Sequence, residues 1–278
     1  SQAPMPTPNR APFRPRQSLG QNFLHDPNMV AKIVGTLEAG PEDPVVEIGA
    51  GTGALTGTLA ERFERFVAIE IDERAVAVLR TEIPEADIRQ QDVRDTDWGE
   101  LAASFGSKLH VISNTPYHLS TEILFALLEN RHHIAEGVLT MQKEVVQRIA
   151  ADPGTKDYGV LSVLTQLFAA PRYAFSVSRH VFSPQPDVTS AVLHVRFGPD
   201  HEPDDLDLND VRPYVRAAFN QRRKMLRNSL RAWSKDQGVA FPNDWGRKRP
   251  EALSPADFAE LARHFNEHAD AVEDRLHE

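Results

Sequence analysis

The sequence predicts an α/β fold, in which a doubly wound, mostly parallel β-sheet is followed by a small all-helical C-terminal domain. Two observations support this. Short apolar runs of β type alternate with helical patterns through the first half of the chain, as is typical of βαβ units. The last part, residues 208–278, then shows only helical patterns.

The parallel strands are expected at five apolar runs, residues 44–51, 66–72, 87–93, 109–114 and 136–142. Helical patterns separate them, most clearly at residues 53–63, 73–83 and 120–130. Two further strand-like runs, 172–182 and 190–197, have no clear helix between them. We therefore expect them to form an antiparallel hairpin that closes one edge of the sheet.

Composition shifts predict four regions. Residues 1–16 contain five prolines and are expected to be a disordered arm. Residues 17–198 would form the sheet domain, residues 199–207 an acidic linker, and residues 208–278 the small helical domain.

Several functional classes are excluded by composition. The 278 residues include no cysteine, so disulfides, thiolate metal sites and a cysteine nucleophile are ruled out. The N-terminal segment lacks the apolar core of a signal peptide, and no apolar run is long enough to span a bilayer. We expect a cytosolic protein without a membrane partner. His132 and His133 are adjacent and show no ligand spacing, so no metal is expected.

The net charge of −9 hides two basic segments. Residues 1–20 carry three arginines and no acid, and residues 212–231 carry seven Arg or Lys and no acid. The acids gather instead in residues 199–210 and near the C-terminus. This distribution is compatible with a nucleic-acid partner in spite of the negative total.

A glycine-rich turn follows the first predicted strand. The segment "VVEIGAGTGALT" (45–56) places Gly49, Gly51 and Gly53 between a strand and a helix, which lets the backbone approach a ligand closely. The spacing is G-x-G-x-G and not the dinucleotide G-x-G-x-x-G, and Glu47 precedes it. This form resembles motif I of the Rossmann-like class I S-adenosylmethionine-dependent methyltransferases.

The next two strands also end in acids. Glu70 stands 21 residues after Gly49, where an acid that accepts hydrogen bonds from ribose hydroxyls is expected. Asp92 ends the third strand and could accept from the exocyclic amine of the cofactor adenine. Because the carboxyl ends of parallel strands face one crevice, these residues predict an S-adenosylmethionine site.

The fourth strand ends in Asn114-Thr115-Pro116-Tyr117. The amine of adenine is a poor nucleophile, because its lone pair is delocalised into the ring. Two acceptors for its hydrogens would localise that lone pair, and we expect them to be the side-chain carbonyl of Asn114 and the backbone carbonyl of Pro116, aimed by the fixed φ of proline. Tyr117 can stack on a base taken out of its stack. The contribution would be orientation and electrostatics, with no strong general base.

These motifs together resemble the KsgA (RsmA) family of ribosomal RNA adenine N6-dimethyltransferases, over most of the chain from about Gln17 to beyond Leu230. The resemblance rests on "SLGQNFLHD" (18–26), "EIGAGTGALT" (47–56), "NTPYHLS" (114–120), the segment 139–163, "VFSPQPDVTSAVLHV" (181–195) and "FNQRRKMLRNSL" (219–230). Members dimethylate two adjacent adenosines near the 3′ end of small-subunit rRNA.

The resemblance also implies roles for single residues. Asn22, Leu24, Gly49 and Gly51 would contact the cofactor, Glu70 its ribose and Asp92 its adenine. Asn114 would lie between cofactor and target amine, and Tyr117 and Phe182 would sandwich the target base. Two positions depart from the family: Thr115 replaces Leu or Ile, and Ala50 replaces a common Pro. We expect neither to abolish the chemistry.

A basic helix is expected over residues 215–233, with one apolar stripe and one basic stripe. Because this segment has no acid for intrahelical pairs, we interpret the basic side chains as an RNA-binding surface. The candidates are Arg216, Arg222, Arg223, Lys224, Arg227 and Arg231. Arg10, Arg14 and Arg16 could add diffuse contacts.

The leading interpretation is a monomeric enzyme that dimethylates small-subunit rRNA in an immature 30S particle. An enzyme of the erythromycin-resistance type, which modifies large-subunit rRNA, shares these motifs. A DNA adenine methyltransferase is disfavoured by the single proline of the catalytic segment. A non-catalytic ribosome-assembly factor is disfavoured because the glycine turn, Glu70 and Asn114 are all intact.

Overall fold

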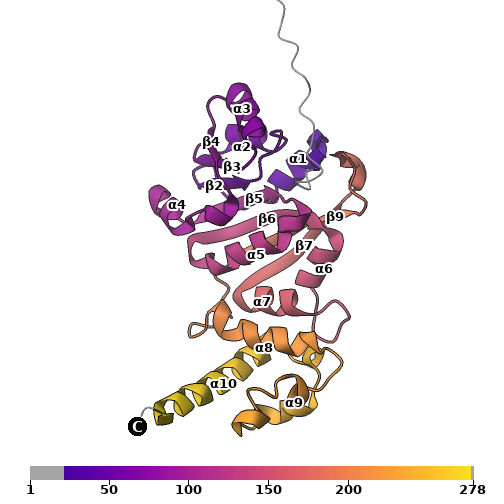
Figure 1. Cartoon of the computed structure of the whole chain (residues 1–278). Helices are drawn as coiled ribbons and strands as arrows, with labels where there is room; N and C mark the ends of the chain where they lie inside the picture. The colour runs from indigo at the N-terminus through magenta and orange to yellow at the C-terminus, as the bar shows by residue number, and fades with distance from the viewer. Residues whose placement is uncertain (1–21, 277–278) are drawn as a thin grey trace, which may run out of the picture.

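The computed structural model describes residues 22–276 and contains a seven-stranded sheet (Figure 1). The strands in spatial order are β4 (Asp87–Gln90), β3 (Phe66–Glu70), β2 (Val45–Ile48), β5 (Leu109–Asn114), β6 (Ile134–Gln142), β9 (Ser190–Phe197) and β7 (Ala169–Val177). The first five are parallel, and β9 runs antiparallel to both β6 and β7. The predicted parallel sheet with an antiparallel hairpin at one edge is confirmed.

Helices cover both faces of the sheet because its strands are apolar on both sides. Within β5, Ile112 joins a buried core with side chains of three helices, α1 (Pro27–Val34), α2 (Thr56–Arg62) and α3 (Glu73–Glu82). The neighbouring Val111 joins the opposite core. There it meets α4 (Trp98–Phe105), α5 (Ser120–Glu129), α6 (Lys143–Ile149) and α7 (Val160–Phe168).

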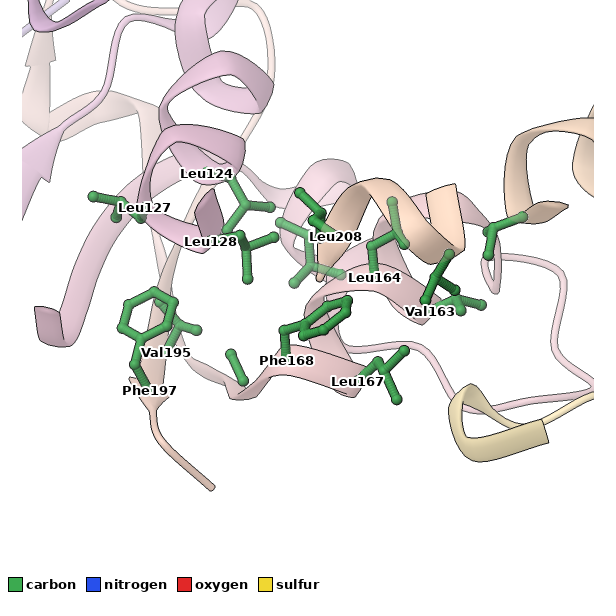
Figure 2. Close-up of a cluster of buried hydrophobic side chains, with 14 of the residues drawn as sticks. Leu124, Leu127, Leu128, Val163, Leu164, Leu167, Phe168, Val195, Phe197 and Leu208 are labelled. Atoms are coloured by element: carbon green, nitrogen blue, oxygen red, sulfur yellow. The ribbon is translucent and has the colours of Figure 1, made fainter. Parts of the chain in front are cut away.

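The C-terminal part is helical and forms a lobe beside α7 (Figure 1). It contains α8 (Leu208–Asn220), α9 (Leu226–Ser229), three short 3₁₀ helices, η6 (Lys235–Gln237), η7 (Pro242–Arg247) and η8 (Pro250–Ala252), and α10 (Pro255–Leu276). Figure 2 shows Leu208, at the start of α8, among the side chains of α5 and α7. The lobe therefore shares a hydrophobic core with one face of the sheet.

The acidic segment between β9 and α8 is anchored by ion pairs. Arg131, only 4% exposed, donates to Glu202 and, at 3.1 Å, to Asp207. Arg263 of α10 donates to Asp205 at 2.6 Å. Because a buried guanidinium without partners would be costly, the Arg131 pairs hold Glu202 and Asp207, and with them the segment, in place. The Arg263–Asp205 pair holds the segment against α10.

The predicted continuous helix over residues 215–233 is wrong. The helix α8 ends at Asn220, because Gln221 leaves the helical region with φ −124° and ψ 51°, and α9 begins only at Leu226. Between them, the Arg222 guanidinium donates to the backbone carbonyls of Tyr158 and Thr155, at 2.5 and 2.9 Å. These tertiary contacts override the helical propensity of the segment. Of the expected apolar stripe, Leu226 and Leu230 are nevertheless buried, and Phe219 and Trp233 are partly buried against the same core.

The predicted strand over residues 172–182 is too long. The strand β7 ends at Val177, and the Ser178 hydroxyl then accepts from the His180 amide at the start of a 3₁₀ helix, η5 (Arg179–Val181). The next two residues form β8 (Phe182–Ser183), which pairs with β1 (Phe23–Leu24) in a separate two-stranded sheet. This pair brings the N-terminal motif to the carboxyl end of the main sheet. The predicted arm at residues 1–16 lies outside the described residues.

A buried polar cluster ties β5, β6 and β9 together near the opposite end of the sheet. The Glu136 carboxylate accepts from His110 Nδ1 at 2.5 Å, from His194 Nε2 at 2.9 Å and from the Glu38 amide at 3.0 Å. Arg172 donates to His194 Nδ1 at 3.2 Å. Nδ1 is therefore the acceptor, and Nε2 carries the hydrogen that it donates to Glu136. Although burial alone would raise it, these hydrogen bonds lower the pKa of Glu136 to about 2.

Glu136→Gln is expected to destabilise the protein by about 2–3 kcal/mol at neutral pH. The pKa of Glu136 in the folded state lies below the ordinary value of 4.5, so the stabilisation is present above that value and is lost as the pH falls toward about 2. Chemical unfolding of both proteins across this range measures the difference, which should shrink with acid. The exposed Glu42→Gln is the control. A difference that does not change with pH would contradict this prediction.

Candidate functional site

Two adjoining cavities lie at the carboxyl ends of β2, β3 and β5. The inner cavity, of about 50 Å³, lies under the β1–β8 pair, and the outer cavity, of about 240 Å³, extends toward the end of β4. Both are lined by Gly49, Glu70 and Pro116, so they adjoin at these residues, and the two are together called the crevice. This is the edge where ligands bind in open parallel sheets.

The predicted catalytic and cofactor residues meet in this crevice. Those of the inner cavity come from β1, β8 and the ends of β2, β3 and β5: Asn22, Leu24, Gly49, Gly51, Glu70, Asn114, Pro116, Tyr117 and Phe182. Asp92 lines the outer cavity. Residues 158 positions apart are thus brought together, since Leu24 pairs with Phe182 across the β1–β8 sheet.

The glycine turn needs its glycines for two separate reasons. Gly51 has φ +57°, and a Cβ atom there would lie 3.0 Å from a ring carbon of Phe23. Gly53 has φ +88°, and its Cβ would lie 2.8 Å from Leu79. The absence of a Cβ atom therefore lets β1 close over the turn and lets α3 lie against it. The positive φ at both positions is the second reason, because glycine adopts it readily.

Two buried carboxyl groups support the turn. Burial and the charge of Asp72 raise the pKa of Glu70 to about 7, in spite of hydrogen bonds from backbone amides, including that of Gly51. Burial also raises the pKa of Glu47 to about 8, opposed by the Thr56 hydroxyl, which donates to it at 2.6 Å. Glu70 therefore ionises near neutral pH and lies where both cavities meet.

The amide of Asn114 has a fixed orientation. Its Nδ2 donates to the backbone carbonyl of Asn22 at 3.1 Å, and both residues line the inner cavity. Because the nitrogen is used in this contact, the side-chain oxygen is the atom left to accept a hydrogen bond from a ligand. The position of β1 thus sets the direction of the Asn114 carbonyl.

The Pro116 carbonyl does not fit the role predicted for it. It accepts from the Leu119 amide at 3.0 Å and from the Ser120 hydroxyl at 3.5 Å, within a 3₁₀ turn, η3 (Tyr117–Leu119), that leads into α5. Its lone pairs are therefore occupied within the turn. Thr115, immediately before Pro116, also lines the inner cavity, so its backbone carbonyl is an alternative candidate for the second acceptor.

The two predicted stacking residues differ in exposure. Tyr117 is half-buried, and its hydroxyl lies 2.5 Å from the hydroxyl of Ser190 at the start of β9. Burial raises the pKa of Tyr117, so the phenol stays neutral, although the Ser190 contact opposes this shift. Phe182 is only 2% exposed and reaches the inner cavity from β8.

Asp92 faces the outer cavity but also has protein partners. Its carboxylate accepts from the Arg94 amide at 2.9 Å and from the Arg94 guanidinium at 2.6 Å, and these contacts lower its pKa. It therefore caps a 3₁₀ helix, η2 (Val93–Asp95), as well as lining the cavity. Its predicted contact with the cofactor adenine stays a prediction.

The Thr115 hydroxyl is buried and has no hydrogen-bond partner among residues 22–276. An unpaired buried hydroxyl costs about 1–3 kcal/mol. Thr115→Val keeps the shape and removes this cost, so we expect it to raise the free energy of unfolding by about 1 kcal/mol with methyl transfer unchanged. Urea unfolding and an activity assay measure both effects. Loss of activity in Thr115→Val would show that the hydroxyl is used.

Among the lining residues that the sequence did not single out, Phe23 and Ile71 have the clearest place in the site. Phe23 covers the glycine turn from β1, and Ile71 is 53% exposed at the outer cavity. An apolar residue between Glu70 and Asp72, just beyond a strand, was the available signal for Ile71. Phe23 lies in a two-residue strand, which has no recognisable period.

The candidate RNA-binding residues lie around the break between α8 and α9. Arg216, Arg223, Lys224 and Arg227 are exposed, and no ion pair joins them to an acid within residues 22–276. Arg231 is also exposed but pairs with Asp236 at 3.1 Å. Arg222 is turned toward the protein, where Glu251 lies 3.4 Å away. Acids thus pair with two of the six candidate residues.

Comparisons with known proteins show which sequences and structures this chain resembles. A curated protein from Salinibacter ruber named "Ribosomal RNA small subunit methyltransferase A" is 67% identical over 263 residues, covering 95% of this chain and 89% of that protein. A dimethyladenosine transferase from Plasmodium falciparum has a similar structure, with a TM-score of 0.74, 23% identity and coverage of 88% of this chain and 98% of that one.

The structure of the 23S rRNA methyltransferase ErmE is also similar, with a TM-score of 0.64, 24% identity and coverage of 88% of this chain and 100% of that one. At these levels of identity, both likenesses show a shared fold. Among residues 22–276, no helix has the length and hydropathy needed to cross a membrane. The sequence model described as "Ribosomal RNA adenine dimethylase" matches residues 13–267, and the chain belongs to that family of methyltransferases.

Proposed function

We propose that this protein transfers methyl groups from S-adenosylmethionine to N6 of two adjacent adenosines near the 3′ end of small-subunit rRNA. The substrate would be an immature 30S particle in the cytoplasm, and the enzyme would act as a monomer. The fixed Asn114 amide, with its oxygen free for a ligand inside the inner cavity, is the observation that carries the proposal. The strong similarity to the Salinibacter ruber protein favours the small subunit.

The crevice suits this cofactor. A nucleoside in the outer cavity would lie against Ile71 with its ribose hydroxyls near Glu70, and the methionine part would enter the inner cavity beside the glycine turn. When bound, the cofactor supplies an electrophilic methyl group. The residues that line the crevice would bind the cofactor, exclude water from the space under the β1–β8 pair and hold the acceptor atoms near the target amine.

The reaction asks little of the protein in acid–base terms. Asn114 would accept one amine hydrogen through its side-chain oxygen. With the Pro116 carbonyl used by its own turn, the backbone carbonyl of Thr115 is the next available acceptor of the segment. The two contacts would localise the nitrogen lone pair toward the methyl group, and Tyr117 would hold the base in plane.

A substrate comparison tests the proposal. The protein and labelled S-adenosylmethionine are incubated with immature 30S particles, mature 50S particles or duplex DNA, and the nucleosides are then separated by chromatography. We expect N6,N6-dimethyladenosine from 30S particles alone. Label in the 50S arm would favour a large-subunit enzyme, and cofactor binding with no transfer to any substrate would favour an assembly factor.

We also assign RNA binding to the C-terminal lobe, residues 208–276 of the predicted small domain. The double variant Arg223→Ala/Lys224→Ala is expected to weaken binding to 30S particles and to reduce the slope of log K against log salt by about 1.5, because each lost phosphate contact contributes about 0.7–0.9. Binding titrations at several salt concentrations measure this slope. Arg62→Ala/Lys108→Ala, a second pair of exposed basic residues, should leave it unchanged. A salt slope in Arg223→Ala/Lys224→Ala that equals the slope of the control variant would contradict the assignment of Arg223 and Lys224 to the RNA interface.

A further inference from the structure

Ser190 is the first residue of β9 and is fully buried. It lies opposite Gln142 at the carboxyl end of β6 and opposite Val177 at the end of β7. Next to it, the Thr189 carbonyl accepts from the Lys143 amide at 3.0 Å. The Ser190 side chain therefore has a fixed position at the edge of the sheet where the crevice lies.

The hydroxyl of Ser190 meets the hydroxyl of Tyr117 at 2.5 Å, across 73 residues of sequence. Tyr117 is not in regular strand or α-helix but in the short 3₁₀ turn after β5, where backbone geometry alone leaves a long side chain several orientations. The hydrogen bond to a buried and rigidly held serine selects one of them. It holds the hydroxyl end of the Tyr117 ring, and Tyr117 also lines the inner cavity.

The same segment carries the other predicted wall of the base pocket. Phe182, in β8, and Ser190, at the start of β9, are the two ends of one connection, and both of them are buried. Phe182, at one end of this connection, lines the inner cavity, and Ser190, at the other end, is hydrogen-bonded to Tyr117. The separation between the two aromatic rings is thus set by one anchored piece of chain.

We propose that Ser190 is a positioning residue, which holds the Tyr117 ring in the orientation needed to stack on the target adenine. The inference rests on the proposed function, because it assigns Tyr117 to the substrate base. Without the serine hydroxyl the ring would sample other rotamers, and the base would be held less often in line with the methyl group. The rate of transfer would fall more than the affinity for the particle, since the particle is bound mainly elsewhere.

A double-mutant cycle tests this role. Ser190→Ala and Tyr117→Phe each remove one partner of the hydrogen bond while keeping the ring. We expect each to lower kcat about fivefold with KM for the 30S particle nearly unchanged, as for the loss of one hydrogen bond. The double variant should be no worse than either single one, because both remove the same interaction. Ser190→Thr, which keeps a hydroxyl, should retain most of the wild-type kcat.

The chain offers a matched control. Tyr173 and Ser176 form a second hydroxyl pair within β7, and neither lines the inner or the outer cavity. Ser176→Ala should leave kcat unchanged. Additive effects of Ser190→Ala and Tyr117→Phe, or wild-type kcat in Ser190→Ala, would overturn the proposal. If the wild-type protein methylates another nucleic acid instead, the proposed function is wrong, and the same cycle on that substrate still decides the role of Ser190.

Discussion

Asn114→Ala is expected to lower the rate of methyl transfer by about 10²–10³, the usual loss when a preorganised polar contact to the reacting group is removed. The side-chain oxygen is the atom that matters, because Nδ2 is already bonded to Asn22. Affinity for the cofactor should change much less, since Glu70 and the glycine turn remain. Single-turnover transfer to immature 30S particles measures the rate, and calorimetry with S-adenosylmethionine measures the affinity.

A second substitution at this position separates the two halves of the amide. Asn114→Asp keeps an acceptor oxygen but cannot donate to the Asn22 carbonyl, so it should be more active than Asn114→Ala and less active than the wild type. Asn28→Ala changes an exposed asparagine outside both cavities and serves as the control. Equal activity of Asn114→Ala and the wild type would remove Asn114 from the mechanism.

The sequence was sufficient to identify the crevice because the crevice is built from strand ends. Glu70 and Asn114 end apolar runs of strand length, and Asp92 lies just beyond the more polar edge strand β4. The topology of parallel strands brings such ends together without further information. The alternation of strands and helices was predictable for the same reason. Strands that face both cores, such as β2 and β3, are nearly continuous apolar runs, whereas the helices, which face one core, show an apolar stripe.

Contacts between distant and irregular segments could not be predicted in this way. The β1–β8 pair has two residues in each strand, too few for any period, and depends on a meeting across about 160 residues. The Tyr117–Ser190 contact depends in turn on the register of β9. The break after Asn220 was missed because the local sequence favours a helix, whereas Arg222 is held by carbonyls of a distant loop.

Glu70→Gln is expected to raise the dissociation constant for S-adenosylmethionine by about 30- to 100-fold at pH values above about 8, because two hydrogen bonds from ribose hydroxyls would lose their charged acceptor. The pKa of Glu70 in the free protein is about 7. Wild-type affinity should therefore weaken as the pH falls through that value, by up to about tenfold per unit. The variant should lack this dependence, and calorimetry across the pH range measures both proteins.

The amine of the cofactor titrates near pH 8 as well, and so does Glu47, which lines the inner cavity and has a pKa of about 8. Glu70→Gln controls for both, because it keeps these two groups and lacks only the Glu70 carboxylate. Glu73→Gln, an exposed acid at the start of α3, is the control on the protein side. Affinity that is unchanged in Glu70→Gln would contradict the assignment of Glu70 to the ribose. Wild-type affinity that is independent of pH would contradict the raised pKa.

The Glu70 carboxylate, which should favour cofactor binding, should in contrast lower the free energy of unfolding of the ligand-free protein. Its pKa in the folded protein, about 7, lies above the ordinary value of 4.5, so the folded state is destabilised progressively as the pH rises between these values. Glu70→Gln should therefore stabilise the ligand-free protein above neutral pH, by up to about 3 kcal/mol, while it weakens cofactor binding. Unfolding without ligand at about pH 5 and pH 8 measures this, and the gain should appear only at the higher pH. Folding alone would favour glutamine at position 70, so a destabilising glutamate there is explained by what it contributes to ligand binding.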